Sequence, residues 1–377
     1  MTAGGVAIAA VVAVAGGYQL FALAAVLRHL FARSAPEPST RPPVSILKPI
    51  RGLDAGFLEA IRSHATQEYA PGFEILFGVR DPADPAVPEI ERLIREFPGV
   101  PIRLLHCSTD APNGKVGVLM DLAKEARYPV WIVSDGDISV PQGYLASVTA
   151  PLAEPPVGVV TCLYRAEASD LPGRFEALGV VTDFAPSALV APLVGVSEFG
   201  FGSTLAFRRD DLLAIGGFEA ISGYVADDYH LGAKIHALGR RNVISQTVVG
   251  ASLHAAGWRD VWKHQVRWAR TIRVSRPAGY AGLPVTHASF WALIAAVTGH
   301  FFLAGALLCV RLALALVSGW VLLRSPDALR WIWLTPLRDL YAVAVWAAGL
   351  AGKKVLWRGR MLTLDPRGRI IQESPSN

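Results

Sequence analysis

A short apolar stretch that ends in two carboxylates constrains this sequence more than any other feature. Residues 130–134 (VWIVS) have the composition of a strand buried on both faces, and Asp135-Gly136-Asp137 follows directly. In a parallel sheet this loop lies at the carboxyl edge, where open α/β folds bind their ligands. Two carboxylates this close repel each other, and a divalent cation carrying a diphosphate is the partner that best keeps both ionised. The stretch therefore predicts a nucleotide-sugar site that uses Mg²⁺ or Mn²⁺.

The composition indicates a membrane protein with a water-exposed part. The 377 residues are 52% hydrophobic and 18% charged, and their mean hydropathy is +0.36. Soluble proteins carry about 25% charged residues. The net charge of +5 is modest and many arginines lie beside apolar runs, which suits a cytoplasmic membrane face and speaks against nucleic acid as a partner. Three widely spaced cysteines without a CxxC pattern argue against a zinc site or a disulfide framework.

Apolar segments at both ends predict membrane anchoring. Residues 4–27 are almost uncharged and long enough to cross a bilayer of about 30 Å. The basic cluster at 28–33 follows this run, which is the reverse of signal-peptide polarity and predicts an outside N-terminus. Residues 288–323 are too long for one straight span, so we expect either an interfacial helix plus a span or a tight hairpin. Two crossings are predicted between the basic flanks at 263–276 and 353–360.

Strand and helix patterns alternate between these ends, which implies right-handed crossovers and a mostly parallel sheet. The predicted strands are 44–47, 73–79, 102–105, 130–134, 158–163, 199–207 and 242–249. The helices between the first four strands are expected at 54–67, 87–97 and 115–126. The expected domains are an N-terminal anchor (1–30), a linker (31–43), a cytoplasmic α/β domain (44–257), an interfacial helix and loop (258–284), membrane segments (285–352) and a basic tail (353–377).

Residues 258–274 predict an amphipathic helix of unusual composition. Three tryptophans, Trp258, Trp262 and Trp268, share one face, and lysine and arginine cover much of the remainder. Tryptophan on one side and arginine on the other is typical of a helix that lies in a membrane interface.

Other polar residues stand where predicted strands end or helices begin. Asp81 follows the strand at 73–79, where a carboxylate can reach the base or ribose of a nucleotide. Asp227-Asp228 opens a helix, and Lys115 lies in a PNGK sequence from which it can reach a nucleotide or a phosphate. Each has a simpler explanation, as a turn residue, a helix-terminal carboxylate or a solvated lysine. The prediction of a nucleotide-sugar site therefore depends on the combination of these residues and on their order along the sheet.

Several stretches occur together in an order that resembles a known family. They are ILFGVRD (75–81), DGDI (135–138), GFGSTLAFR (200–208), GGF (216–218), ADDY (226–229) and RW (267–268). As a set they resemble the membrane glycosyltransferases of the GT-A class, and within these the ceramide glucosyltransferase family, glycosyltransferase family 21. Through HQVRWARTIR (264–273) and RPAGY (276–280) the chain is most similar to the bacterial branch associated with hopanoid biosynthesis. The resemblance covers roughly residues 44–285. It departs at His264, where the family motif often has Gln or Arg.

The resemblance implies an α/β GT-A fold with N-terminal and C-terminal transmembrane helices. It also implies an inverting enzyme of the bacterial inner membrane, whose cytoplasmic domain moves glucose or N-acetylglucosamine from a UDP-sugar to a membrane lipid hydroxyl. A hopanoid polyol is the expected acceptor and ceramide is the alternative. Asp135 and Asp137 would hold the metal, and Asp228 would be the general base, with Asp227 as the alternative. The residues expected to contact the nucleotide sugar are Asp81, Lys115, Asp135, His264, Arg267 and Trp268.

Three other functions stay open at this point. A processive polysaccharide synthase would need more spans than the apolar content provides. A non-enzymatic scaffold is disfavoured by the intact carboxylates. A polyprenyl-phosphate sugar transferase has an anionic acceptor that needs no general base, so insensitivity to the loss of Asp228 would favour it.

Overall fold

The computed structural model describes residues 3–33, 41–253, 257–357 and 360–375, which form two compact units. The sheet unit comprises residues 33–164 and 196–253, and the helical unit comprises residues 1–32, 165–195 and 254–377. The predicted α/β domain at 44–257 included 165–195, which belongs to the helical unit instead. Most of the linker predicted at 31–43 lies outside the described residues.

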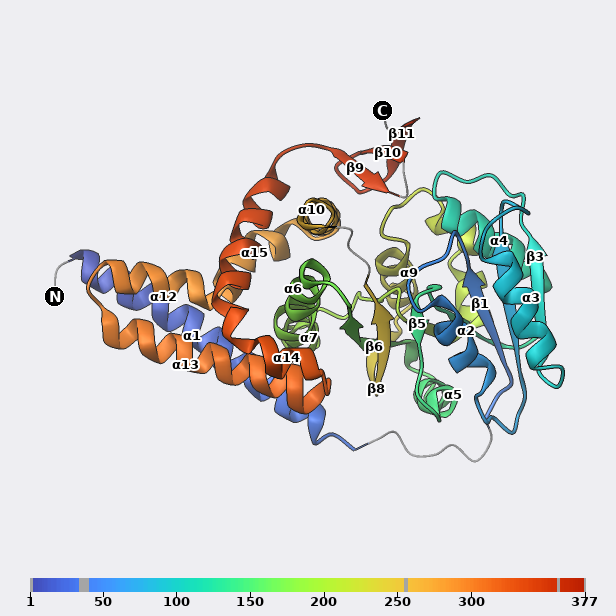
Figure 1. Cartoon of the computed structure of the whole chain (residues 1–377), viewed down its shortest axis with the longest axis horizontal. Coiled ribbons are helices and arrows are strands. Elements are labelled where there is room, and N and C mark those ends of the chain that lie inside the picture. Colours follow the sequence, from blue (N-terminus) through green and yellow to red (C-terminus); the bar gives the residue numbers. More distant parts are fainter. Residues whose placement is uncertain (1–2, 34–40, 254–256, 358–359, 376–377) are drawn as a thin grey trace. The chain divides into compact units, whose positions relative to one another are not determined.

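The sheet unit contains a mixed eight-stranded sheet in the order β3-β2-β1-β4-β7-β6-β8-β5 (Figure 1). Its first half is parallel and consists of β1 (Val44–Pro49), β2 (Phe73–Val79), β3 (Ile102–His106) and β4 (Val130–Val133). The connecting helices are α2 (Phe57–Ala65), α3 (Val87–Glu96) and α4 (Gly114–Glu125). The chain winds outward from β1 to β3 and then returns to β4 on the other side of β1. This reversal makes the β1/β4 pair a topological switch point, the usual ligand position in such sheets.

The second half of the sheet is antiparallel where its register is defined. It contains β5 (Ile138–Ser139), β6 (Val157–Glu167), β7 (Leu205–Arg208) and β8 (Arg241–Ser252), with β7 paired to β4 and to β6, and β5 paired to β8. Its helical segments are α5 (Tyr144–Thr149), η1 (Ala150–Ala153), α8 (Arg209–Ala214), η4 (Phe218–Ile221) and α9 (Asp227–His236). The strand predicted at 199–207 is wrong over most of its length, because residues before Leu205 form a loop with one isolated bridge, Phe201 to Thr204. Glycines let this loop pass against α9, since a Cβ at Gly200 would lie 2.6 Å from the Asp228 carbonyl oxygen.

Side-chain alternation along β1 divides the apolar core between the two faces of the sheet. Val44 and Ile46 join one buried cluster with residues of α2, α3 and α5, and Leu47 joins a second with residues of α4, α8 and α9. The central strands are therefore covered on both sides, as expected for buried parallel strands.

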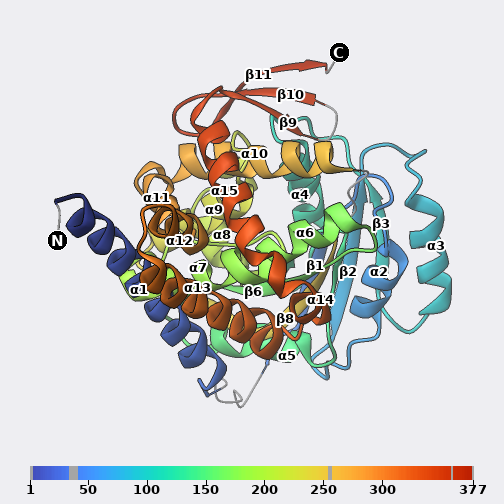
Figure 2. The ribbon, with the colours of Figure 1, turned by 60° about the vertical axis from the view of Figure 1, so that its left-hand side comes forward.

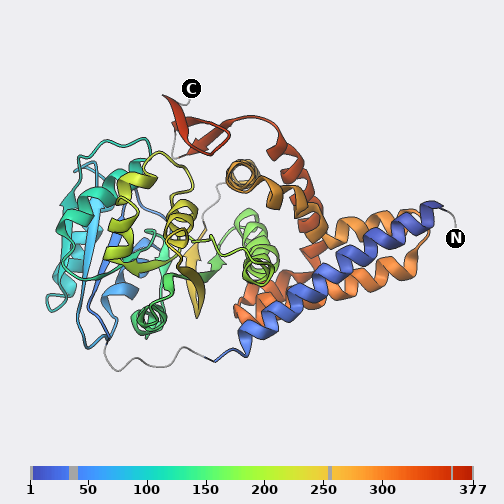
Figure 3. The ribbon, with the colours of Figure 1, turned by 180° about the vertical axis from the view of Figure 1, so that it is seen from behind.

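In the helical unit α1 (Ala3–Leu30), α12 (Ala288–Val297) and α13 (Phe301–Leu316) lie side by side (Figures 1 and 3). Gly299, with φ of 85°, makes the turn between α12 and α13. The hairpin alternative for 288–323 is therefore the observed one.

The helical unit also includes residues 171–194, for which no helix was predicted from the sequence, and a small C-terminal sheet. Its other helices are α6 (Leu171–Gly179), η2 (Val180–Phe184), α7 (Ala185–Val190), η3 (Ala191–Val194), α10 (Trp258–Ser275), α11 (Pro277–Gly282), η5 (Leu283–Thr286), η6 (Val317–Leu322), α14 (Pro326–Trp331), η7 (Ile332–Leu334) and α15 (Thr335–Leu350). The predicted basic tail forms three antiparallel strands, β9 (Lys354–Trp357), β10 (Arg360–Leu364) and β11 (Ile370–Pro375), shown in red in Figure 2.

Among the described residues, three helical segments are long and apolar enough to cross a membrane: Gly4–Leu30, Leu171–Val194 and Phe301–Leu322. Pro277–Thr286 and Ala288–Val297, bent by 51° at their junction, would make a fourth if together they form one span. That pair and Phe301–Leu322 would supply the two crossings predicted between the basic flanks.

A buried ion pair joins the helices of this unit. Arg311 Nη2 lies 2.7 Å from Asp339 Oδ1, and each side chain is 1% exposed. Arg311 Nη1 also donates to the carbonyl of Thr182 at 2.8 Å, and Asp339 Oδ2 accepts from the Ser289 hydroxyl at 2.7 Å. The pair therefore connects α12, α13, α15 and η2.

Candidate active site

Four backbone segments of the sheet unit meet at the carboxyl end of β4. Lys115, in the first turn of α4, places Nζ 2.7 Å from Asp135 Oδ1 and 3.1 Å from Asp227 Oδ2. Asp228 follows Asp227 in the first turn of α9. It accepts a hydrogen bond from the backbone N–H of Gly202, which lies in the loop before β7. The structure thus brings Lys115, Asp135, Asp227 and Asp228 together, as their order in the sequence predicted.

Asn113 fixes the position of Lys115. Its Oδ1 caps α4 by accepting the backbone N–H groups of Lys115 and Val116 at 3.0 and 3.3 Å. Its Nδ2 donates to the carbonyl of Tyr224 at 2.8 Å, just before α9. One buried amide therefore joins the N-termini of two helices, and both helix dipoles favour negative charge at this place.

Lys115 forms ion pairs with Asp135 and Asp227, so the simpler explanation that it is a solvated surface lysine is wrong. Burial by itself would lower the pKa of its ammonium, but the carboxylates of Asp135, Asp227 and Asp228 outweigh burial and raise that pKa. The positive charge is therefore held in the cluster at neutral pH.

The two adjacent carboxylates of α9 differ in their surroundings. Asp227 is buried and paired with Lys115, and Asn113 Nδ2 lies 3.4 Å from its Oδ1. Asp228 accepts the backbone N–H groups of Gly202 at 2.9 Å and of Tyr229 at 2.8 Å. Burial and the neighbouring charge of Asp227 raise the pKa of Asp228 to about 6. Asp228 is thus the carboxylate better suited to take up a proton near neutral pH.

Asp137 needs a positive partner to stay ionised. Burial, followed by the charges of Asp135 and Asp54, raises the pKa of Asp137 to about 7. No three His, Cys, Asp or Glu side chains of the described chain converge as a preformed metal site. Asp135 and Asp137 nevertheless fit Mg²⁺ or Mn²⁺, because these cations commonly take one or two protein carboxylates and complete their coordination with water and substrate phosphates.

Sequence reasoning missed Lys48, which lies beneath the acidic loop at the end of β1. It is fully buried, and its Nζ donates to the carbonyl of Asp135 at 2.9 Å and to the Ser134 hydroxyl at 3.3 Å. Burial lowers its pKa to about 7 against the opposing charges of Asp137 and Asp135. A lysine inside the otherwise apolar VSILKP strand was the available signal.

The structure does not bring Asp81 into this cluster. Its side chain is exposed, and its Oδ1 accepts the backbone N–H of Ala83 at 2.9 Å, which is the turn role of the simpler explanation. The buried carboxylate of this loop is Asp84, which accepts from the backbone N–H groups of Gly52 and Ala86.

His264, Arg267 and Trp268 lie on α10 of the helical unit. His264 Nδ1 is 2.6 Å from Glu176 Oε1, and the rings of His264 and Trp268 are 4.5 Å apart. Gln265 donates to the same Glu176 oxygen at 2.7 Å and accepts from Arg338 at 2.8 Å. Neither Glu176 nor Arg338 was predicted, because α6 and α15 contribute them from distant parts of the sequence.

Comparison with known proteins identifies the family of this chain. A family model described as glycosyl transferase family 21 matches residues 6–370. The chain belongs to glycosyl transferase family 21. The resemblance to this family drawn from the motifs is thereby confirmed, and the assignment to the hopanoid-associated branch stays a prediction.

Curated relatives of this family-21 chain include two proteins of Caenorhabditis elegans. Ceramide glucosyltransferase 1 is 29% identical over 213 residues, which are 56% of this chain and 45% of the relative. Ceramide glucosyltransferase 3 is also 29% identical over 213 residues, with shares of 55% and 46%. The chain thus spans about half the length of these relatives.

A solved structure resembles the fold of this family-21 chain. It is the mannosyltransferase PcManGT from Pyrobaculum calidifontis in complex with GDP-Man and Mn²⁺, with a TM-score of 0.58 and 20% sequence identity. The likeness covers 91% of this chain and 97% of that one. At this identity it concerns the fold alone, and it confirms the predicted GT-A class.

Gly202 gives a test of the cluster geometry. A Cβ at Gly202 would lie 2.8 Å from Asp135 Oδ2 and 3.6 Å from Asp228 Oδ2, so Gly202→Ala must displace a carboxylate. We expect the catalytic rate of this site to fall about 100-fold, the cost of a displacement of roughly 1 Å in a reacting site. Gly223→Ala is the matched control, because nothing lies within 4 Å of its added Cβ. Equal initial rates for the two variants would contradict the geometry.

Proposed function

We propose that this chain is a membrane-bound glycosyltransferase that moves a hexose from a UDP-sugar to a hydroxyl of a membrane lipid, with inversion. The observation that carries the proposal is the cluster in which Lys115 joins Asp135 and Asp227 beside Asp228 at the sheet's switch point. Membership of glycosyl transferase family 21 and the apolar helices of the helical unit support it.

In the donor half of the site, Asp135 and Asp137 would hold Mg²⁺ or Mn²⁺, which offsets charge on the leaving diphosphate when bound. Lys115, held by Asn113, adds a fixed positive charge beside Asp135. Lys48 supports the backbone of the acidic loop through the Asp135 carbonyl. We also propose that Asp81 contacts the nucleotide, because it lies in the loop that follows β2.

In the acceptor half, Asp228 takes the proton from the lipid hydroxyl as the oxygen attacks the anomeric carbon on the face opposite the leaving diphosphate. One displacement of this kind inverts the anomeric configuration. Asp227 is the weaker candidate, because its charge is engaged by Lys115. The roles proposed for His264, Arg267 and Trp268, which are to pair with the diphosphate and to cover the sugar, rest on the motif resemblance.

Two lipid acceptors have support. The names of the curated relatives favour ceramide. The stretches at 264–273 and 276–280 favour a hopanoid polyol through the resemblance to the bacterial branch, and glucose and N-acetylglucosamine both stay candidate sugars. The resemblance to the bacterial branch is our reason for proposing the bacterial inner membrane, and the basic residues that follow residue 27 are our reason for proposing that the sheet unit faces the cytoplasm.

The proposed function is tested directly with the purified full chain. It is incubated with UDP-glucose or UDP-N-acetylglucosamine and with ceramide or a hopanoid polyol, and UDP release and glycolipid formation are followed. The proposal predicts UDP release that depends on the lipid and a product of inverted configuration by NMR. A product of retained configuration would contradict it.

Metal dependence gives another expected result. Asp137→Ala should lose the metal-dependent part of UDP-sugar binding, and EDTA should remove the same part from the unchanged protein. Isothermal titration calorimetry with and without EDTA measures both effects. Binding that is unchanged by the substitution and by EDTA would remove the metal assignment.

The raised pKa of Asp228 predicts a pH dependence. A general base acts in its deprotonated form, so kcat should fall as pH drops through about 6 and level off above it. The measurement uses saturating donor, metal and acceptor, because Asp137 also has a raised pKa and controls binding. A kcat that is constant between pH 5 and pH 7 would contradict the assignment of Asp228.

A further inference from the structure

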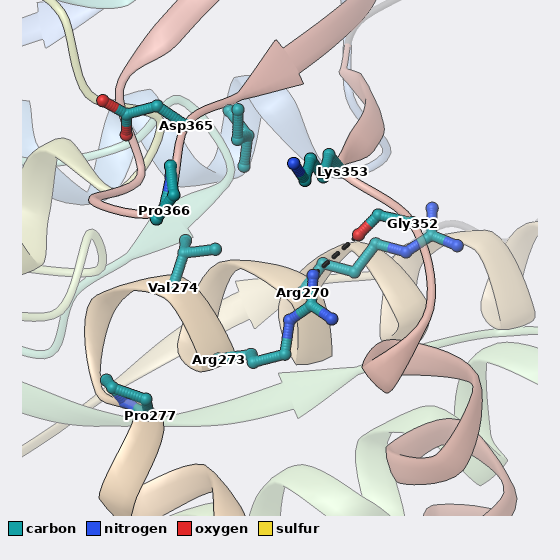
Figure 4. A pocket seen from close by; sticks show the side chains of 9 residues that line it. Arg270, Arg273, Val274, Pro277, Gly352, Lys353, Asp365 and Pro366 are labelled. Carbon is teal, nitrogen blue, oxygen red and sulfur yellow. Dashed lines mark hydrogen bonds between the residues drawn. The ribbon is translucent and has the colours of Figure 1, made fainter.

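A basic pocket in the helical unit has no role in the proposed transfer reaction. Its volume is about 300 Å³, at the lower end of ligand pockets. Figure 4 shows Arg270 and Arg273 of α10 on one side and Lys353, which precedes β9, on another. The other lining residues are Val274, Pro277, Gly352, Leu364, Asp365 and Pro366.

The two arginines are held in place by backbone carbonyls between the end of α15 and the start of β9. Arg270 Nε donates to the carbonyl of Ala351 at 3.0 Å and its Nη1 to that of Lys354 at 2.6 Å. Arg273 Nη2 donates to the carbonyl of Gly352 at 2.6 Å, and its Nη1 donates to that of Leu350. A guanidinium has five N–H donors, so these bonds fix both groups and leave three donors on each.

The positive charge of the lining is only partly balanced. Within the described parts of the chain, none of Arg270, Arg273 and Lys353 forms an ion pair with a carboxylate. The one acidic lining residue, Asp365, uses Oδ1 to accept the backbone N–H groups of Arg367 and Arg369 in the turn after β10. The C-terminal dipole of α15 adds only about half a negative charge. Burial and the charge of Arg273 lower the pKa of Arg270.

Part of the lining is apolar, and the surrounding unit contains long apolar helices. Val274, Pro277 and Leu364 provide apolar contacts beside the cations. The same unit contains the candidate spans, and α10 also carries Trp258 and Trp262, which are 51% and 36% exposed. Tryptophan and arginine together on an amphipathic helix suit a membrane interface, where phosphate headgroups lie.

We propose that this pocket binds the phosphate of an anionic membrane lipid, with Arg270 and Arg273 as fixed donors and Lys353 as a further cation. Preformed guanidinium groups match the oxygens of a phosphodiester, and the apolar lining residues suit the lipid portion next to it. The bound lipid would be a partner of the protein and separate from the glycosylated acceptor.

Native mass spectrometry of the full chain in detergent tests this inference by titration with phosphatidylglycerol or phosphatidylcholine. The unchanged protein should bind one phosphatidylglycerol preferentially, and Lys353→Gln should weaken that binding about fivefold. Lys353 is suitable because its side chain is exposed. Lys263→Gln, which removes the same charge from an exposed position of α10 outside the pocket, should bind as the unchanged protein does.

Equal phosphatidylglycerol binding by the two variants would overturn the proposal, as would equal affinity for phosphatidylcholine. A further arm adds inorganic phosphate at millimolar concentration. Displacement of the lipid by phosphate, with phosphate binding itself dependent on Lys353, would assign the pocket to a soluble anion and overturn the lipid assignment. Retention of the lipid supports it.

Discussion

Asp228→Asn is expected to lower sugar transfer by at least about 100-fold while UDP-sugar binding persists. The amide cannot take a proton from the acceptor hydroxyl, and a general base contributes roughly 10²–10⁴-fold to such reactions. The Asp228 carboxylate is held by the N–H groups of Gly202 and Tyr229, and its pKa of about 6 suits proton uptake near neutral pH. Initial rates at saturating substrates give kcat, and calorimetry gives the donor Kd.

Asp210→Asn is the matched control for this variant. Asp210 is exposed in the first turn of α8, so the substitution removes a helix-terminal carboxylate of the same unit away from the cluster. Its kcat should stay within about twofold of that of the unchanged protein, since exposed substitutions rarely perturb a fold. Full activity of Asp228→Asn would remove the base assignment and favour an anionic polyprenyl-phosphate acceptor, which needs no base.

Asp339→Ala is expected to destabilise the helical unit by about 3–5 kcal/mol, because it leaves Arg311 as an uncompensated buried charge. Both side chains are 1% exposed, and the carboxylate also accepts from the backbone and hydroxyl of Ser289. Thermal unfolding of the purified protein in detergent, followed by circular dichroism, should show a clearly lowered midpoint.

The double variant Arg311→Met/Asp339→Leu separates charge burial from helix packing. Replacing both partners with apolar residues of similar size is often neutral or stabilising, so most of the lost stability should return. A single Asp339→Ala variant that unfolds at the same temperature as the unchanged protein would show that this ion pair does not stabilise the unit.

The parallel half of the sheet was predictable because its signals are local. Each strand from β1 to β4 is a short, mainly apolar run, and each of the first three is followed by a helix whose length fits a crossover. The two carboxylates after β4 and those that open α9 were visible for the same reason. Their positions at the ends of strands and helices were enough to predict that Asp135, Asp227 and Asp228 meet.

The missed residues depend on contacts between distant parts of the chain. Lys48 acts on the Asp135 carbonyl across the β1/β4 pair, and Glu176 reaches His264 from α6. The sequence marks such partners only as a lysine in an apolar strand or a glutamate in an apolar helix. Likewise, the strands β9 to β11 are only four to six residues long, and their pairing with one another is what makes them a sheet.

The central claim is that a lipid hydroxyl receives the sugar and that Asp228 enables the transfer. The most direct measurement is mass spectrometry of membrane lipids from cells that express the chain, with and without ceramide or a hopanoid polyol. The proposal predicts a hexosylated lipid that appears only with an acceptor and is absent when Asp228→Asn is expressed at the same level. No new glycolipid with either acceptor, or a sugar found on a polyprenyl phosphate instead, would contradict it.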